Sequence, residues 1–204
     1  MTSNSNPQNS CLKVCHLHQP PVEPEAGGLT PAVASSHSFK ARVSFRRTTE
    51  EDLEMLCRIL AHPEVSEGFF GSRLPAFVVQ EYVERGVHLA KQPQCIQLTA
   101  IDRRSQSVIG SAMLVNQDLS YFTCPEVWGQ GYGTELVRTV CCLVHQELNI
   151  DCINARILRN NDRSRRILDG LKFQFTGLGT YWICDGRWKA AMLNYRLSVF
   201  SHLT

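Results

Sequence analysis

One stretch of the chain combines closely spaced glycines with the start of a helix. It reads Trp128-Gly129-Gln130-Gly131-Tyr132-Gly133-Thr134-Glu135. A short aromatic-rich segment that is typical of a strand precedes it, and apolar residues at helical spacing follow it. Glycines let backbone N–H groups converge on a ligand, and the start of a helix favours negative charge. The spacing therefore predicts an anion site for a ligand that carries phosphate.

The chain is long enough for one domain with a sizeable core. It has 204 residues, of which 43% are hydrophobic. Residues 1–40 are rich in Asn, Ser, Pro and Gly, which predicts a flexible tail before a domain at 41–204. A net charge of +2 does not favour nucleic acid or an acidic membrane as a partner. No apolar run is long enough to span a bilayer.

Nine cysteines raise the question of disulfides and metal ligands. Their positions in apparent helices and strands do not form a disulfide framework, so we expect reduced thiols and a cytoplasmic protein. Cys11, Cys15, His16 and His18 lie in the tail, but their spacing matches no usual four-ligand zinc pattern. We therefore expect no metal.

The remaining patterns predict an α+β domain built on one central sheet. A strand at 43–46 precedes a helix that begins at Thr48 or Thr49 and ends at His62-Pro63. Residues 64–75 are predicted to be irregular, 76–85 to be a helix, and 95–101 and 108–115 to be strands. After the glycine stretch and its helix come a strand at 153–158, a helix carrying Ile167 and Leu168, and a hairpin that turns at Asp185-Gly186.

These residues together resemble a known family. The element order, the glycine loop, and Asn161-x-x-Ser164 followed by Leu171-x-Phe173 resemble the GNAT superfamily of acetyl-CoA-dependent N-acetyltransferases. Residues 121–135 are similar to the branch that acetylates the alanine or serine N-termini of ribosomal proteins, where Trp stands in the slot of Trp128. The resemblance covers about residues 42–197. It implies a mixed, mostly antiparallel sheet that is flanked by helices and splayed between its fourth and fifth strands.

The resemblance also implies an acetyl-CoA site and no metal. The backbone of the glycine loop would hold the pyrophosphate, the strand before it would pair with the pantetheine arm, and Trp128 would pack under the loop. Arg138, Arg163 and Arg166 are candidates for the 3′-phosphate. The full set of expected cofactor residues is Phe122, Thr123, Cys124, Trp128, Gly129, Gln130, Gly131, Tyr132, Gly133, Thr134, Asn161 and Ser164.

The implied reaction is direct attack of a neutral amine on the acetyl thioester. A backbone N–H around Thr123 would stabilise the oxyanion, and Ser164 would donate to the leaving sulfur. In many relatives a tyrosine at the position of Leu168 donates to the leaving sulfur instead. Glu81 is the expected base, with Glu84, His62 and His88 as further candidates. Cys124 is expected to be a packed thiol rather than a nucleophile.

The acceptor is less well defined by the sequence. We expect a primary amine, either on a small molecule or at a protein N-terminus, and a monomer or a homodimer. Thr176 stands where close relatives carry a glutamate, Lys172 replaces a common glycine, and Lys189 replaces a frequent acid. These departures motivate an alternative, a catalytically impaired acyl-CoA-binding module with a regulatory role.

Overall fold

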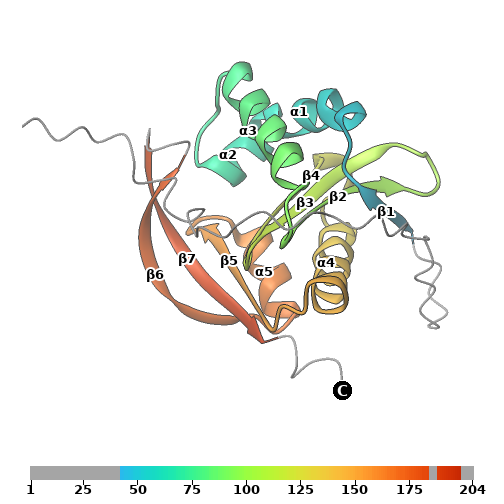
Figure 1. Cartoon of the computed structure of the whole chain (residues 1–204). Coiled ribbons are helices and arrows are strands. Elements are labelled where there is room, and N and C mark those ends of the chain that lie inside the picture. The colour runs from blue at the N-terminus through green and yellow to red at the C-terminus, as the bar shows by residue number, and fades with distance from the viewer. Residues whose placement is uncertain (1–41, 184–187, 199–204) are drawn as a thin grey trace, which may run out of the picture. The chain divides into compact units, whose positions relative to one another are not determined.

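A seven-stranded sheet runs through the part of the chain that the computed structural model describes, residues 42–183 and 188–198 (Figure 1). The strands are β1 (Val43–Arg47), β2 (Cys95–Asp102), β3 (Val108–Val115), β4 (Asp118–Thr123), β5 (Cys152–Leu158), β6 (Gln174–Ile183) and β7 (Trp188–Ser198). The helices are α1 (Leu53–Ala61), α2 (Pro63–Phe70), α3 (Ala76–Leu89), α4 (Tyr132–Leu148) and α5 (Asp162–Gly170). Short 3-10 turns lie at Glu50–Asp52 and Pro125–Val127.

The strand order in space is β1-β2-β3-β4-β5-β7-β6. Only β4 and β5 run parallel among the described neighbours, and every other pair is antiparallel. The register of β4 with β5 is limited to Asp118↔Asn154 and Leu119↔Ala155, after which the two strands diverge. The predicted mixed sheet with a splay between its fourth and fifth strands is thus confirmed.

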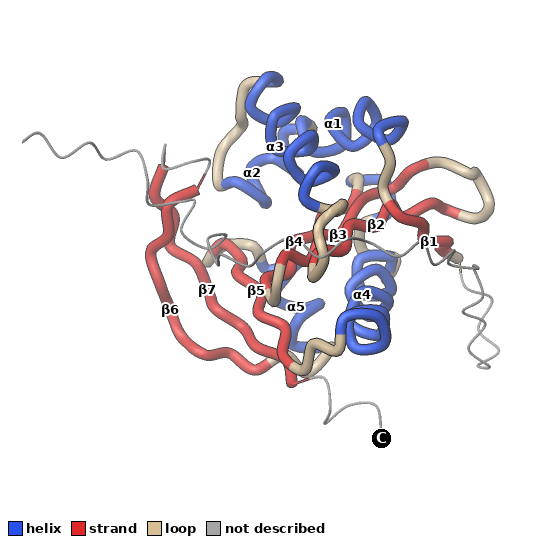
Figure 2. The backbone as a smooth tube through the Cα atoms, in the orientation of Figure 1, coloured by secondary structure: helices blue, strands red, loops and turns tan. Residues whose placement is uncertain are grey.

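Helices cover both faces of the sheet (Figure 2). The α4 and α5 face is apolar: Ile96 and Leu98 of β2 pack with Leu136 and Val140 of α4 in the main core. Because side chains alternate along a strand, the intervening residues of β2 face α1 and α3 instead. Among them is Gln97, which is buried although it is polar. The face of the sheet that α1 and α3 cover, which includes Gln97, is therefore partly polar.

A buried carboxylate secures the start of this second layer. Asp52 accepts hydrogen bonds from both terminal nitrogens of Arg46 at 2.7 and 2.6 Å, and from the Thr49 N–H and Thr99 hydroxyl at 2.9 and 3.0 Å. Burial alone would raise the pKa of the Asp52 carboxyl, but these hydrogen bonds together hold its pKa below the usual range. The network ties β1, β2 and the entry to α1 together.

The structure corrects one prediction and extends another. Residues 64–75 were predicted to be irregular, yet α2 occupies Pro63–Phe70. Pro63 does end α1, but a proline also suits the first position of a new helix, where no N–H is needed. Helix α3 continues past residue 85 to Leu89 because Val87 extends its buried stripe. The predicted tail at 1–40, its Cys and His residues, and the hairpin turn at Asp185-Gly186 lie outside the described residues.

Candidate functional site

Two glycines shape the turn that leads from β4 into α4. Gly129 and Gly131 have φ of +73° and +87°, the left-handed region that glycine adopts without strain. Gly131 is the N-cap of α4, and the first intrahelical bond runs from the Glu135 N–H to the Gly131 carbonyl at 3.1 Å. The amides of Tyr132, Gly133 and Thr134 therefore precede the helical hydrogen-bond ladder. Such amides at a helix start suit a phosphate.

Gly133 is required for helix packing. A Cβ at this position would lie 2.8 Å from Ile167 Cδ1, so the glycine allows α4 to approach α5 closely. The loop is also held by Arg42, which sequence reasoning missed. Its Nη2 donates to the Gln130 carbonyl at 2.8 Å, and its guanidinium lies 4.6 Å from the centre of the Tyr132 ring.

Trp128 joins the loop to β4 and to α5. Its indole Nε1 donates to the Thr123 carbonyl at 3.1 Å. The Arg163 guanidinium stacks on its ring at 3.9 Å and reaches the Glu64 carboxylate at 3.5 Å. Trp128 thus fixes the end of β4, as a packing role predicts. Arg163, a candidate for the 3′-phosphate, is engaged with protein groups on both sides.

The end of β4 exposes one particular amide to the splay. The Cys124 N–H donates to the Ile109 carbonyl of the β3 side at 2.8 Å. Backbone groups of an antiparallel pair alternate in direction, so Phe122 also faces β3 whereas Tyr121 and Thr123 face β5. Pairing with β5 stops at Leu119. Of the three strand residues predicted to meet the cofactor, Thr123 therefore has its N–H directed into the gap.

Asn161 and Ser164 form the start of α5 on the other side of this gap. The Asn161 Oδ1 accepts from the Ser164 N–H at 3.0 Å, and its Nδ2 donates to the Gly68 carbonyl of α2 at 2.7 Å. The Tyr121 hydroxyl of β4 donates to the Ser164 carbonyl at 3.5 Å. Burial raises the pKa of the Tyr121 phenol, and its contact with Ser164 offsets only part of that rise. The structure thus brings Ser164 next to β4, with a neutral phenol between them that the sequence did not indicate.

Leu168, at the position of the tyrosine found in many relatives, is a core residue in this chain. Leu168 is fully buried in the main core beneath α5. A phenol at this place would need a partner for its hydroxyl. Ser164, one turn earlier and only half-buried, is left as the polar side chain of this helix turn nearest to Tyr121.

The candidate bases are spread apart. Glu81 lies on the exposed side of α3 and pairs with Arg85 at 3.1 Å, so the structure does not bring it to Ser164 or Thr123. Its role stays a prediction. His62 lies between α1 and α2, and its buried Nδ1 has no hydrogen-bond partner among the described residues. The pKa of Glu126, two residues after Cys124, is lowered by its own backbone N–H, by the Cys124 thiol and, more weakly, by His62. His62 is thus linked to the end of β4.

The thiol beside the gap is not activated. Burial and the neighbouring Glu126 carboxylate raise the pKa of Cys124 to about 11. Cys124 is one of six cysteines in the described ranges, and all six are free thiols. Within the same ranges, no group of three His, Cys, Asp or Glu side chains is arranged to hold a metal ion. No helix there is long and apolar enough to cross a membrane.

The departures from the family pattern lie at the end of α5 and on the last hairpin. Lys172 has φ of +65°, which accounts for the glycine that the resemblance leads one to expect there. The Thr176 hydroxyl donates to the Asn194 carbonyl at 3.2 Å, and the Lys189 ammonium lies 4.6 Å from the centre of the Trp182 ring. These side chains have local structural partners.

Comparison with known families agrees with this geometry. The model of the acetyltransferase (GNAT) domain matches residues 42–174. The chain belongs to this family. It is an N-acetyltransferase with the GNAT fold. One curated relative, the uncharacterized N-acetyltransferase p20 of Bacillus licheniformis, is 24% identical over 150 residues, which are 69% of this chain and 83% of the relative.

Solved structures share the fold of this GNAT acetyltransferase at low sequence identity. A spermidine N-acetyltransferase from Vibrio cholerae, in complex with CoA and spermine, aligns with a TM-score of 0.66 and 14% identity, covering 81% of this chain and all of that one (100%). A ribosomal-protein-S5-alanine acetyltransferase from Vibrio fischeri aligns with a TM-score of 0.64 and 16% identity, covering 80% and 96%. The second has the function of the branch that the loop sequence resembles.

Proposed function

We propose that this GNAT acetyltransferase moves an acetyl group from acetyl-CoA directly onto a primary amine of a peptide N-terminus or a small molecule. The observation that carries the proposal is the gap after Leu119, where β4 leaves β5 while the Thr123 N–H points to the side of β5 rather than to β3. The left-handed glycine turn and the first amides of α4 follow within ten residues. A thioester between the strands and a pyrophosphate on the turn would fit this arrangement.

The chain's own groups then have defined roles. The amine nitrogen forms a bond to the thioester carbonyl carbon, and the carbon–sulfur bond breaks as the thiolate departs. The Thr123 N–H donates to the carbonyl oxygen as it gains negative charge. The Ser164 hydroxyl donates to the departing sulfur, and the amine loses its surplus proton to water or a base. An α-amine with a pKa of about 7.7–8.0 is already partly neutral near pH 7, so a strong base is not required.

A thiol-release assay with acetyl-CoA tests the proposal. Peptides with free N-termini, amino alcohols, polyamines and aminoglycosides would be offered one at a time to the full chain. We expect measurable CoA release with at least one of them. Tight binding of CoA without release of thiol by any amine would instead support the impaired binding module.

A matched pair of variants tests the cofactor site separately. Gly131→Gln and Gly131→Glu share the strain of a side chain at φ +87° and differ only in charge. A carboxylate about 5 Å from a phosphate charge costs about 3 kcal/mol at an effective dielectric constant near 20. The Arg42 guanidinium, whose Nη2 would lie 3.3 Å from the new Cβ, offsets part of this cost, so we expect a loss of about 10- to 100-fold in affinity. Calorimetry with CoA should therefore show much weaker binding for the glutamate variant than for the glutamine variant. Equal affinities would place the phosphates elsewhere.

A further inference from the structure

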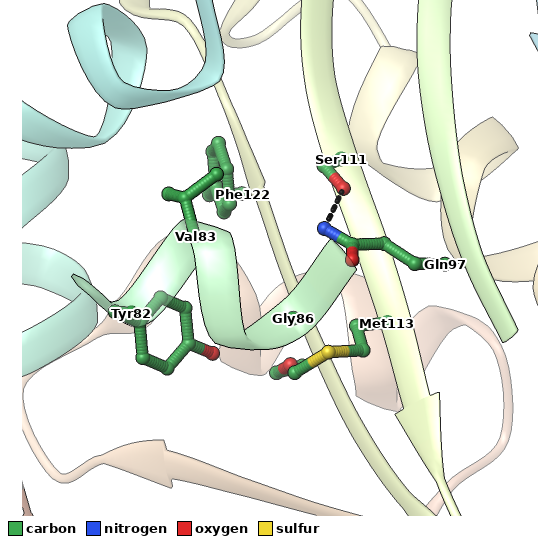
Figure 3. Close-up of a pocket in the computed structure, with 8 residues that line it drawn as sticks. Tyr82, Val83, Gly86, Gln97, Ser111, Met113 and Phe122 are labelled. Carbon is green, nitrogen blue, oxygen red and sulfur yellow. Dashed lines mark hydrogen bonds between the residues drawn. The ribbon is translucent and has the colours of Figure 1, made fainter. Parts of the chain in front are cut away.

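A small pocket lies between α3 and the partly polar face of the sheet that α3 covers (Figure 3). It measures about 10 Å³, roughly the space that one water molecule needs. Its walls come from Tyr82 and Gly86 of α3, Gln97 of β2, Ser111 of β3, and Ser120 and Phe122 of β4. Tyr82 of α3 and Ser120 and Phe122 of β4 are partly exposed.

The base of the pocket holds a polar group with unused hydrogen-bonding capacity. The side chain of Gln97 is almost entirely buried, with the residue 4% exposed. Its Nε2 donates to the Ser111 hydroxyl at 3.5 Å, while its Oε1 has no partner among the described residues. Figure 3 shows this amide directed toward Ser111 and the turn of α3 that carries Gly86. A buried carbonyl oxygen without a donor is costly, which indicates that a donor occupies the space beside it.

Gly86 lets α3 lie directly against the Gln97 amide. A Cβ at this position would lie 3.0 Å from Gln97 Oε1 and 3.2 Å from Met113 Sδ. Gly86 is buried in the interior of α3, where alanine would form helix more readily by about 1 kcal/mol. A glycine that weakens its own helix at the one turn facing Gln97 is consistent with a need for this close approach.

We propose that this pocket binds the uncharged polar end of the acceptor, a hydroxyl group that takes the place of one water molecule and donates to Gln97 Oε1. The proposal rests on the proposed function, because Phe122 lines the pocket and directly precedes Thr123 on β4. Successive strand residues are about 3.4 Å apart, so the pocket lies one strand residue from the proposed oxyanion donor. None of the described residues that line it carries a charge. An ammonium group would lose its water there without a carboxylate to replace it, so the pocket disfavours polyamines.

Three amines of equal length test whether the pocket prefers a hydroxyl, a methyl or an ammonium group. 5-Amino-1-pentanol, hexylamine and 1,5-diaminopentane differ only in the last heavy atom, which is a hydroxyl, a methyl or an ammonium. Turnover would be measured by thiol release, and binding to the CoA-loaded full chain by calorimetry. We expect the amino alcohol to exceed hexylamine by about 2- to 12-fold, the effect of one neutral hydrogen bond, and the diamine to be the weakest.

Two variants test whether the preference for the amino alcohol over hexylamine arises in the pocket. Gln97→Leu removes the acceptor oxygen, and Gly86→Ala places a methyl group against it, so both should bring the ratio of amino alcohol to hexylamine close to one. Gly170→Ala is the matched control, because a Cβ there meets nothing within 4 Å, and it should keep the wild-type ratio.

The outcomes separate the two proposals. Equal binding of alcohol and hexylamine by the wild type, or a preference that survives in both pocket variants, would show that the space holds only water and would overturn the inference. Selective binding of the alcohol without any thiol release would support the pocket and contradict the acetyl transfer. Selective binding together with turnover supports both.

Discussion

Replacing Gly110 by alanine should impair the chemical step more than cofactor binding. Gly110 of β3 stands opposite Thr123 of β4. A Cβ there would overlap the Phe122 carbonyl oxygen and would lie 2.8 Å from Thr123 Cα. These are backbone atoms that cannot rotate away, so Thr123 would have to move by about 0.6 Å or more to reach ordinary contact. The displaced residue is the one whose N–H faces the gap.

The size of the effect follows from this displacement. A misplacement of about 1 Å can cost a factor of about 100 in rate, so we expect kcat to fall by roughly 10- to 100-fold. Overpacking should also lower the free energy of unfolding by about 1–3 kcal/mol, which is a shift of several degrees in the thermal midpoint. The glycine turn expected to hold the phosphates lies beyond the perturbed pair, so the Kd for CoA should rise by a smaller factor than kcat falls.

Steady-state thiol release, calorimetry with CoA and thermal unfolding together check this expectation. The control is Gly170→Ala, which should match the wild type in kcat and in Kd for CoA and should unfold at the same or a slightly higher temperature, because Gly170 is the last residue of α5. A folded Gly110→Ala variant with wild-type kcat would refute the assignment of the Thr123 N–H to the transition state. A variant that lost CoA affinity and kcat to the same extent would contradict the separation of the strand end from the phosphate turn.

Three further outcomes are expected. Ser164→Ala should lower kcat by about 10- to 100-fold with little change in CoA affinity, because a hydrogen bond to a charged sulfur is worth about 1.5–3 kcal/mol. Ser164→Thr keeps a hydroxyl and should restore part of the rate. Stopped-flow measurement of thiol release would detect both changes. Trp128→Phe keeps an aromatic ring for Arg163 but loses the hydrogen bond to Thr123, so kcat should fall by about 2- to 12-fold. Asp52→Asn should lower the free energy of unfolding at pH 7 by about 2–4 kcal/mol in urea titrations. Because folding lowers the pKa of Asp52, its contribution is complete above about pH 4 and is lost as pH falls through the folded-state pKa, so wild type and variant should converge in acid.

The sequence predicted the fold well where local chemistry and packing agree. The glycine turn, α4 and the order of the strands follow from spacing, since apolar residues at helical or alternating intervals must face a core. The failure at α2 has a definite cause. His62-Pro63 was interpreted only as a stop for α1, although the same proline also starts α2, and the left-handed Gly71 ends it.

The candidate site was predictable at the level of the loop and not at the level of its contacts. Nothing in the order of residues shows that Arg42, nearly ninety positions away, donates to the Gln130 carbonyl. The direction of each amide on β4 likewise depends on the register with β3, which sequence patterns do not determine. Glu81 was chosen by type and region, but the phase of α3 turns it toward Arg85 and solvent.

The unactivated thiol at the end of β4 has a consequence for the order of events in catalysis. An enzyme that stores an acetyl group on itself needs a thiolate or a similar nucleophile beside the donor. Cys124 has the right location, but with a pKa of about 11 it remains almost wholly protonated at neutral pH. The proposed direct transfer then requires donor and acceptor to occupy the protein together, in a ternary complex, before the acetyl group moves. An amine that arrives after CoA has departed finds no acetyl group to accept.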